Sequence, residues 1–275
     1  MSEKTVIERT ERPNTIGTLK KDLISLGLKT GDRVIVHTSL SRIGWISGGA
    51  VAYIDALLEV VGPNGTVVMP TQTADNSDPA AWGNPPVPKN WIPTIARTTP
   101  AFDADKTPTR GMGRVPEVFR KYPGAIRSNH PTDSFAALGK DARSLTQHHA
   151  LSPGFGLDSP LGYLYLNQGK ILLTGVGYDT CTALHLAECL SGVVPKRKLK
   201  TAMMEQGKRI WRTFSDYDYD SDDFPLLGKA YERERRVAKR SLGMAETRLI
   251  DLADLIDFAV IWMRKKRSGH GPKDD

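Results

Sequence analysis

Cysteine is scarce in this 275-residue chain, which contains only two. Cys181 and Cys189 fall within one predicted helix and form no metal-ligand spacing, so we expect reduced thiols, no bound metal and a cytoplasmic location. Long apolar runs are also missing, and the first residues alternate in charge instead of forming the apolar core of a signal peptide. The sequence therefore predicts a protein without a membrane partner.

Nucleic-acid-binding patterns are missing as well, although the chain is basic. Its 38 basic residues exceed its 31 acidic residues by 7, with basic runs at 196–198, 233–240 and 264–267. No zinc-finger, aromatic-rich RNA-binding or zipper pattern accompanies these runs, so we interpret them as solvated faces or tails. With 39% apolar and 25% charged residues, the composition is that of an ordinary soluble protein with a substantial core.

Residues 170–190 contain the most informative pattern of the chain. The apolar run 171–173 is typical of a buried strand, and Gly175 and Gly177 favour a tight turn after it. The stretch 182–190 is rich in helix formers, with an N-cap expected at Asp179 or Thr180. The segment therefore predicts a strand, a turn and a helix.

Two polar residues of this unit are suited to proton transfer. His185 and Glu188 are three positions apart and would share one helix face, near the carboxyl end of a strand, where α/β proteins usually bind ligands. Such a pair can also be an exposed polar face. The glycines resemble the start of a dinucleotide fingerprint, but Thr180 stands where the third glycine belongs, so we expect no nicotinamide site.

The first third of the chain predicts a β–α–β unit. A helix is expected over 14–28, a strand over 33–36, a second helix over 50–61 and a second strand over 65–70. Two strands joined through a helix pair in parallel, which indicates an α/β fold. The hydroxyl-rich loop 37–44 is either an anion site or an ordinary strand-to-helix connection.

The remaining segments are less regular. The proline-rich stretch 74–108 is long enough to suggest a functional wall of a cleft. A hairpin is expected over 200–214, followed by an acidic, aromatic loop at 216–224. Helices are expected over 228–240 and 247–266.

Four segments of the chain carry a family resemblance when they are taken together: 37–44, 107–113, 128–131 and 175–188. In combination they resemble the aminoglycoside 3-N-acetyltransferase family. The resemblance extends from about residue 14 to about residue 265, in the family's order and spacing. It implies a single three-layer α/β/α domain over 14–266, with a mainly parallel central sheet plus a C-terminal hairpin and helices. Residues 1–13 would be an N-terminal extension and residues 267–275 a flexible basic and polar tail.

The resemblance also implies a reaction. The donor would be acetyl-CoA and the acceptor the 3-amino group of a 2-deoxystreptamine aminoglycoside, as in antibiotic resistance, with the enzyme a monomer or homodimer. Cys181 stands where family members often have asparagine, and Asp133 after His-Pro-Thr is also unusual. These departures concern which antibiotic is accepted.

The chemistry of amine acetylation requires a base, because an aminoglycoside amine is largely protonated in water. We assign this role to His185, assisted by Glu188, with Asp179 as the alternative carboxylate. His130 either shapes the same pocket or is purely structural. Direct transfer needs no thiol nucleophile, so we interpret Cys181 as a pocket-lining residue.

The two ligands require opposite charges. By resemblance, acetyl-CoA lies against one group of residues: Ser39, Leu40, Ser41, Gly44, Thr107, Arg110, Met112 and Arg114. A polycationic sugar needs acidic residues instead, and the candidates are Asp75, Asp78, Asp179, Glu188, Asp216, Asp218 and the rest of the 216–223 loop.

Other classes of function stay open on the residues alone. A serine hydrolase is one, although the chain has no Gly-x-Ser-x-Gly elbow. A CoA- or sugar-binding protein without catalysis is another, as is an acetyltransferase for a different amine.

Overall fold

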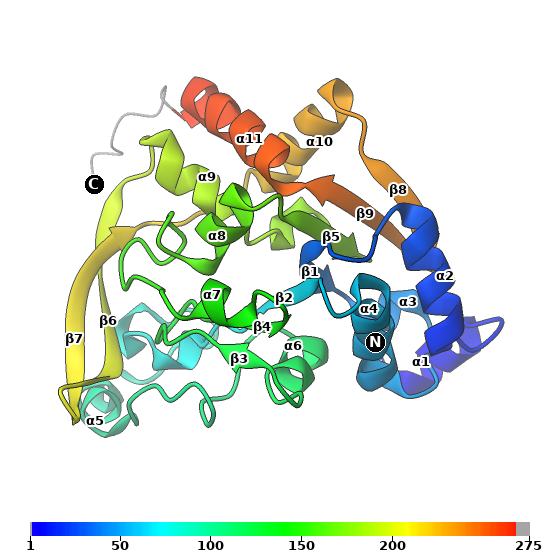
Figure 1. The fold of residues 1–275 in the computed structure, drawn as a ribbon. Coiled ribbons are helices and arrows are strands. Elements are labelled where there is room, and N and C mark those ends of the chain that lie inside the picture. The colour runs from blue at the N-terminus through cyan, green and yellow to red at the C-terminus, as the bar shows by residue number, and fades with distance from the viewer. Residues whose placement is uncertain (1, 268–275) are drawn as a thin grey trace.

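A seven-stranded sheet forms the centre of the computed structural model, which describes residues 2–267 (Figure 1). Its strand order is β3–β4–β2–β1–β5–β9–β8. The strands are β1 (Arg33–Thr38), β2 (Thr66–Pro70), β3 (Ile126–Arg127), β4 (Phe135–Gly139), β5 (Lys170–Thr174), β8 (Ala238–Leu242) and β9 (Ala245–Asp251). A separate hairpin consists of β6 (Lys196–Glu205) and β7 (Lys208–Tyr217).

The three central strands are parallel, since β1 pairs with both β2 and β5 in that sense. The pairs toward both edges are antiparallel. Five of the seven strands nevertheless run in one direction, because β3 and β8 are each reversed twice relative to the centre. The predicted α/β class with a mainly parallel sheet is confirmed.

Helices cover both faces of the sheet. They are α1 (Glu3–Arg9), α2 (Ile16–Leu26), α3 (Leu40–Ile43), α4 (Gly49–Val61), α5 (Ile92–Thr98), α6 (Arg114–Phe119), α7 (Ala142–Thr146), α8 (Pro160–Leu166), α9 (Leu184–Ser191), α10 (Phe224–Glu234) and α11 (Leu252–Arg267). Within residues 2–267, none of these helices has both the length and the apolarity needed to cross a membrane.

Alternation along β1 explains the three layers. Val34 and Val36 point into a core shared with α2, α4 and α6, whereas Ile35 points into a core shared with α8, α9 and α11. Successive side chains of a strand face opposite sides, so a strand covered on both faces is apolar at every central position. The predicted three-layer arrangement follows from this pattern.

The expected helix–strand–helix–strand order of residues 14–70 is present as α2, β1, α4 and β2, and the predicted hairpin is β6–β7. Two expected helices are wrong in part. Residues 238–240 and 247–251 belong to β8 and β9, because residues 247–251 of β9 pair with β5 and β8 pairs with β9. This pairing outweighs the local helical pattern.

The proline-rich stretch 74–108 is more ordered than its composition suggests. It contains three short 3-10 turns and α5, and it packs against the β6–β7 hairpin. The buried amide of Asn76 donates to the Thr201 hydroxyl and to the Ala202 carbonyl. The cavity described below is lined by residues 111–116 of the following segment.

Candidate active site

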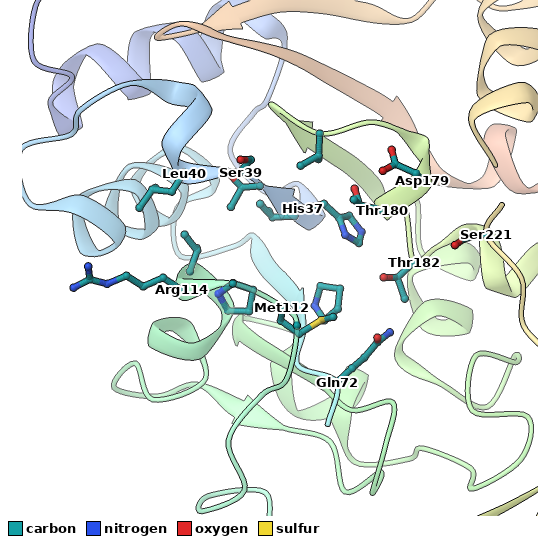
Figure 2. A pocket seen from close by; sticks show the side chains of 18 of the residues that line it. His37, Ser39, Leu40, Gln72, Met112, Arg114, Asp179, Thr180, Thr182 and Ser221 are labelled. Atoms are coloured by element: carbon teal, nitrogen blue, oxygen red, sulfur yellow. The ribbon is translucent and has the colours of Figure 1, made fainter. Parts of the chain in front are cut away.

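The main cavity of interest has a volume of about 590 Å³ and opens where the carboxyl ends of β1, β2 and β5 meet. This is the usual ligand position in α/β sheets. Figure 2 shows Ser39 and Leu40 facing Met112 and Arg114, with Asp179, Thr180 and Thr182 on a third side. Further lining residues are His37, Thr38, Ser41, Pro70, Gln72, Val176, His185 and Ser221.

The first wall follows β1. Ser39 is the N-cap of the short helix α3, and its amide donates to the carbonyl of Thr174 in β5 at 3.0 Å. Ser39, Leu40 and Ser41 all line the cavity. Gly44 ends this turn with a φ of 96°, which favours glycine, and a side chain there would meet Thr10 at 3.0 Å. Gly44 therefore shapes the loop from behind.

The second wall precedes and begins α6. Met112 and Arg114 line the cavity, whereas Thr107 and Arg110 are absent from its lining. The Thr107 hydroxyl accepts a hydrogen bond from the amide of Asp103. Arg110 lies 3.5 Å from Asp75, and both side chains are more than half exposed. Thr107 therefore holds the segment together from outside the cavity.

His185 lies in the first turn of α9 and lines the third wall. Its Nδ1 is 2.6 Å from Oε2 of Glu188, whose side chain is fully buried. The other oxygen of Glu188 accepts hydrogen bonds from the Asp220 amide at 3.0 Å and from Arg267 at 2.5 Å. A carboxylate only accepts, so Nδ1 of His185 carries the hydrogen, and in the neutral ring Nε2 then keeps its lone pair.

Three rings fix the orientation of His185. Phe155 stacks on it with 5.1 Å between centroids, while Tyr219 meets it edge-on at 5.2 Å. Phe224 lies on another side at 5.1 Å. Together with the bond to Glu188, these contacts leave the imidazole little freedom to rotate.

Of the two alternative residues for proton transfer, one lines the cavity and the other does not. Asp179 lines the cavity from a 3-10 turn, and α9 begins only at Leu184, so neither Asp179 nor Thr180 is its N-cap. His130 is 1% exposed and absent from the lining. Its Nδ1 accepts the amide of Asp133 at 2.8 Å and its Nε2 lies 3.2 Å from the carbonyl of Leu151, which favours a structural role.

The candidate acids for a cationic substrate are also dispersed. Asp216 is fully buried and accepts hydrogen bonds from the amides of Gly154 and Tyr217. Asp218 is half-exposed and lies 3.0 Å from Arg197. Asp179 lines the cavity, while Glu188 lies directly behind His185. The acidic loop reaches the cavity through Ser221.

Two functional candidates were not predicted from the sequence. His37, at the end of β1, lines the cavity, and burial followed by the proximity of His185 lowers its pKa to about 3. Arg267 was expected in a tail but is the last residue of α11 and lies against Glu188. The end of a buried strand was an available signal for His37. For Arg267 there was none, since its partner is 79 positions away.

Cys181 is 1% exposed and does not line the cavity. Burial raises the pKa of its thiol to about 12, so the thiol is protonated and a poor nucleophile. Within residues 2–267, no cluster of three or more His, Cys, Asp or Glu side chains is arranged to hold a metal ion.

The geometry is that of an α/β transferase or hydrolase with a histidine–carboxylate pair at a cleft. A family model described as aminoglycoside 3-N-acetyltransferase matches residues 35–264. The chain belongs to the aminoglycoside 3-N-acetyltransferase family and is thus an acyltransferase.

Relatives match over nearly the whole chain. The aminoglycoside N(3')-acetyltransferase-like protein YokD of Bacillus subtilis is 43% identical, over 94% of this chain and 96% of its own. Aminoglycoside N(3)-acetyltransferase IX of Micromonospora chalcea is 35% identical, over 97% and 99%.

Solved structures agree with this assignment. The crystal structure of YokD has a TM-score of 0.95 at 41% identity, covering 98% of this chain and 100% of that one. AAC-VIa bound to sisomicin has a TM-score of 0.83 at 33% identity, covering 94% and 100%. AAC-IIIb in a binary complex with CoASH has a TM-score of 0.83 at 30% identity, covering 95% and 100%.

Proposed function

We propose that this enzyme transfers acetyl from acetyl-CoA to the 3-amino group of a 2-deoxystreptamine aminoglycoside, with His185 as general base. The observation that carries the proposal is the 2.6 Å contact between His185 and the buried Glu188 at the wall of the cavity. Family membership supports the reaction class, and the CoASH and sisomicin complexes of two relatives support the two ligands.

The proton inventory supports His185 as the base. In the neutral imidazole Nε2 has the free lone pair, because Nδ1 donates to Glu188. As the amine nitrogen attacks the thioester carbon, Nε2 accepts its proton and Glu188 stabilises the imidazolium that forms. The thiolate of CoA leaves as the carbon–sulfur bond breaks and is then protonated. No enzyme-bound acetyl group is needed.

The cavity offers complementary sides for the two ligands. We place acetyl-CoA against Ser39, Leu40 and Ser41 on one wall and Met112 and Arg114 on the other, where Arg114 suits a phosphate group. On this proposal Gly44, Thr107 and Arg110 shape the walls from outside. We assign Asp179 to the binding of a cationic amine of the substrate, because it lines the same cavity as His185.

Thiol release from acetyl-CoA tests the function directly. The wild-type enzyme should release thiol only when an aminoglycoside such as sisomicin is present, and NMR of the product should find acetyl on the 3-amino group. His185→Ala should lower kcat by about 10²–10⁴-fold, the usual contribution of a general base. His148→Ala is the control, because His148 is an exposed histidine outside the cavity.

The outcomes separate the alternatives. Equal thiol release with and without aminoglycoside would indicate a thioesterase, and no release with any amine would indicate a binding protein. Wild-type turnover by a folded His185→Ala variant would remove His185 as the base and leave Asp179 as the cavity-lining candidate.

A further inference from the structure

Arg267 connects the C-terminal end of α11 to the carboxylate behind His185. One nitrogen of its guanidinium lies 2.5 Å from Oε1 of Glu188, while Oε2 of the same carboxylate is 2.6 Å from Nδ1 of His185. Glu188 is therefore held at both oxygens, by a cation on one side and by the imidazole on the other.

The same guanidinium also holds the surroundings of His185. Its Nε and a second nitrogen donate to the two carboxylate oxygens of Asp223, at 2.9 and 2.5 Å. It donates to the carbonyl of Asp220 at 3.0 Å and lies 6.0 Å from the ring of Phe224, which itself contacts His185. Arg267 thus holds both the His185–Glu188 pair and the loop that contains Ser221, which lines the cavity.

Glu188 needs such a partner. Its side chain is fully buried, and a buried carboxylate is costly unless its charge is paired. Among residues 2–267, the donors to its carboxylate besides His185 are Arg267 and the single amide of Asp220. Burial lowers the pKa of Arg267, but its hydrogen bonds to Asp223 and Glu188 outweigh burial and raise that pKa above its ordinary value, so the cation persists.

We propose that Arg267 is a positioning residue of the acetyl-transfer site: it holds the carboxylate of Glu188 in place so that His185 keeps its proton on Nδ1 and presents Nε2 to the amine. This inference deepens the proposed function and rests on His185 being the base. Arg267 lies outside the matched family model, which ends at residue 264, so the assignment comes from this chain's own contacts.

Kinetics separate positioning from general support of the fold. Arg267→Gln should lower kcat by about 10–100-fold, a part of the 10²–10⁴-fold that a general base contributes, while acetyl-CoA affinity stays unchanged. Lys265→Gln is the matched control, because it removes one exposed positive charge from the same helical turn and should leave kcat unchanged.

A double-mutant cycle tests the route of the effect. If Arg267 acts through Glu188, Arg267→Gln should cost little more in a Glu188→Gln background, so the two changes should be strongly non-additive. Full additivity, or a lowered unfolding midpoint with kcat unchanged per folded molecule, would overturn the proposal and leave Arg267 as an anchor of α11.

The tautomer of His185 provides a readout that needs no aminoglycoside. Nitrogen NMR of histidine-labelled protein, assigned with His185→Ala, should find the neutral ring protonated at Nδ1 in the wild type and mixed between Nδ1 and Nε2 in Arg267→Gln. An unchanged tautomer would overturn the proposal. If the wild type fails to acetylate aminoglycosides, the proposed function falls, yet this NMR result still decides the role of Arg267.

Arg267→Lys covers the case in which Arg267→Gln does not fold. A lysine keeps the charge but lacks the planar fork that binds Asp223 and Glu188 together. We expect a kcat reduction of about tenfold, within the same general-base range, with the fold retained. Wild-type kcat and tautomer in Arg267→Lys would show that charge alone is enough and would overturn positioning by the fork.

Discussion

Gly228 of α10 lies directly against the ring of Tyr178: a Cβ at position 228 would come within 2.1 Å of Cδ2 of that ring. Tyr178 begins the 3-10 turn in which Asp179 lines the cavity. The Tyr178 hydroxyl lies 3.2 Å from Glu232, which also belongs to α10. A close approach of helix and ring therefore sets the position of one cavity wall.

Gly228→Ala should consequently destabilise the protein, by about 1–3 kcal/mol as for other overpacked sites, and raise the KM of at least one substrate. Thermal unfolding and steady-state kinetics measure the two effects. Gly83→Ala is the control, since a Cβ there meets nothing within 4 Å. Identical behaviour of the two variants would show that α10 yields easily at Tyr178.

The buried His37 should make stability depend on pH. In the folded protein the pKa of His37 is lowered from 6.5 to about 3, so below pH 6.5 the unfolded chain binds a proton that the folded protein does not bind. Keeping His37 neutral therefore costs no stability above pH 6.5. As pH falls from 6.5 toward 3, the free energy of unfolding decreases, by at most about 1.4 kcal/mol per pH unit. Denaturant unfolding should therefore show a shallower pH dependence in His37→Gln than in the wild type. His148→Gln, an exposed substitution, should leave the slope unchanged.

Cys181 should be unreactive in the folded protein. Its thiol is 1% exposed with a pKa raised by burial to about 12, so iodoacetamide at pH 8 should label it only after denaturation. Cys181→Ala should retain most of the wild-type kcat, because the proposed transfer from acetyl-CoA is direct. Mass spectrometry measures the labelling, and an acetylated Cys181 peptide after acetyl-CoA treatment would contradict direct transfer.

Ser39→Trp should obstruct acetyl-CoA, because Ser39 lines the cavity at the end of β1. We expect a weaker affinity by calorimetry and a smaller rise of the unfolding midpoint with acetyl-CoA. Ser47→Trp, at an exposed position outside the cavity, serves as the control. Unchanged affinity in the Ser39 variant would place the cofactor elsewhere.

The exposed acids of the 216–223 loop should attract a cationic substrate. Replacing Asp218, Asp220 and Asp222 with asparagine should raise the aminoglycoside KM and make it less sensitive to salt, with acetyl-CoA binding unchanged.

Asp216 and Asp223 are excluded from that variant because their hydrogen bonds hold Gly154 and Arg267. A matched triple variant of distant exposed acids, Glu59→Gln with Glu205→Gln and Asp257→Asn, controls for net charge. An equal change in the aminoglycoside KM of both triple variants would show that the loop is only a solvated surface.

Sequence patterns predicted those elements whose structure depends mainly on their own residues and not on pairing with distant segments. The apolar run of β5 and the glycines after it located the turn beside the cavity, and the three-residue spacing located the His185–Glu188 pair. β8 and β9 were missed because their strand character comes from pairing with β5, which local propensity does not contain. Asp216 was expected to bind the cationic substrate, yet it is fully buried and accepts a hydrogen bond from the amide of Gly154, 62 positions away in the chain.

The pairing of β1 with β5 joins two separate halves of the chain, with Val34 opposite Lys170 and Thr38 opposite Thr174. Ser39 and Met112 come from the first half and His185 from the second, so neither half alone encloses the cavity. Recombination between related genes at a point between β4 and β5 would therefore exchange the two sides of the cleft as intact pieces. The wall proposed to bind acetyl-CoA and the proposed base would then come from different parents, and they would be matched only along the paired strands β1 and β5.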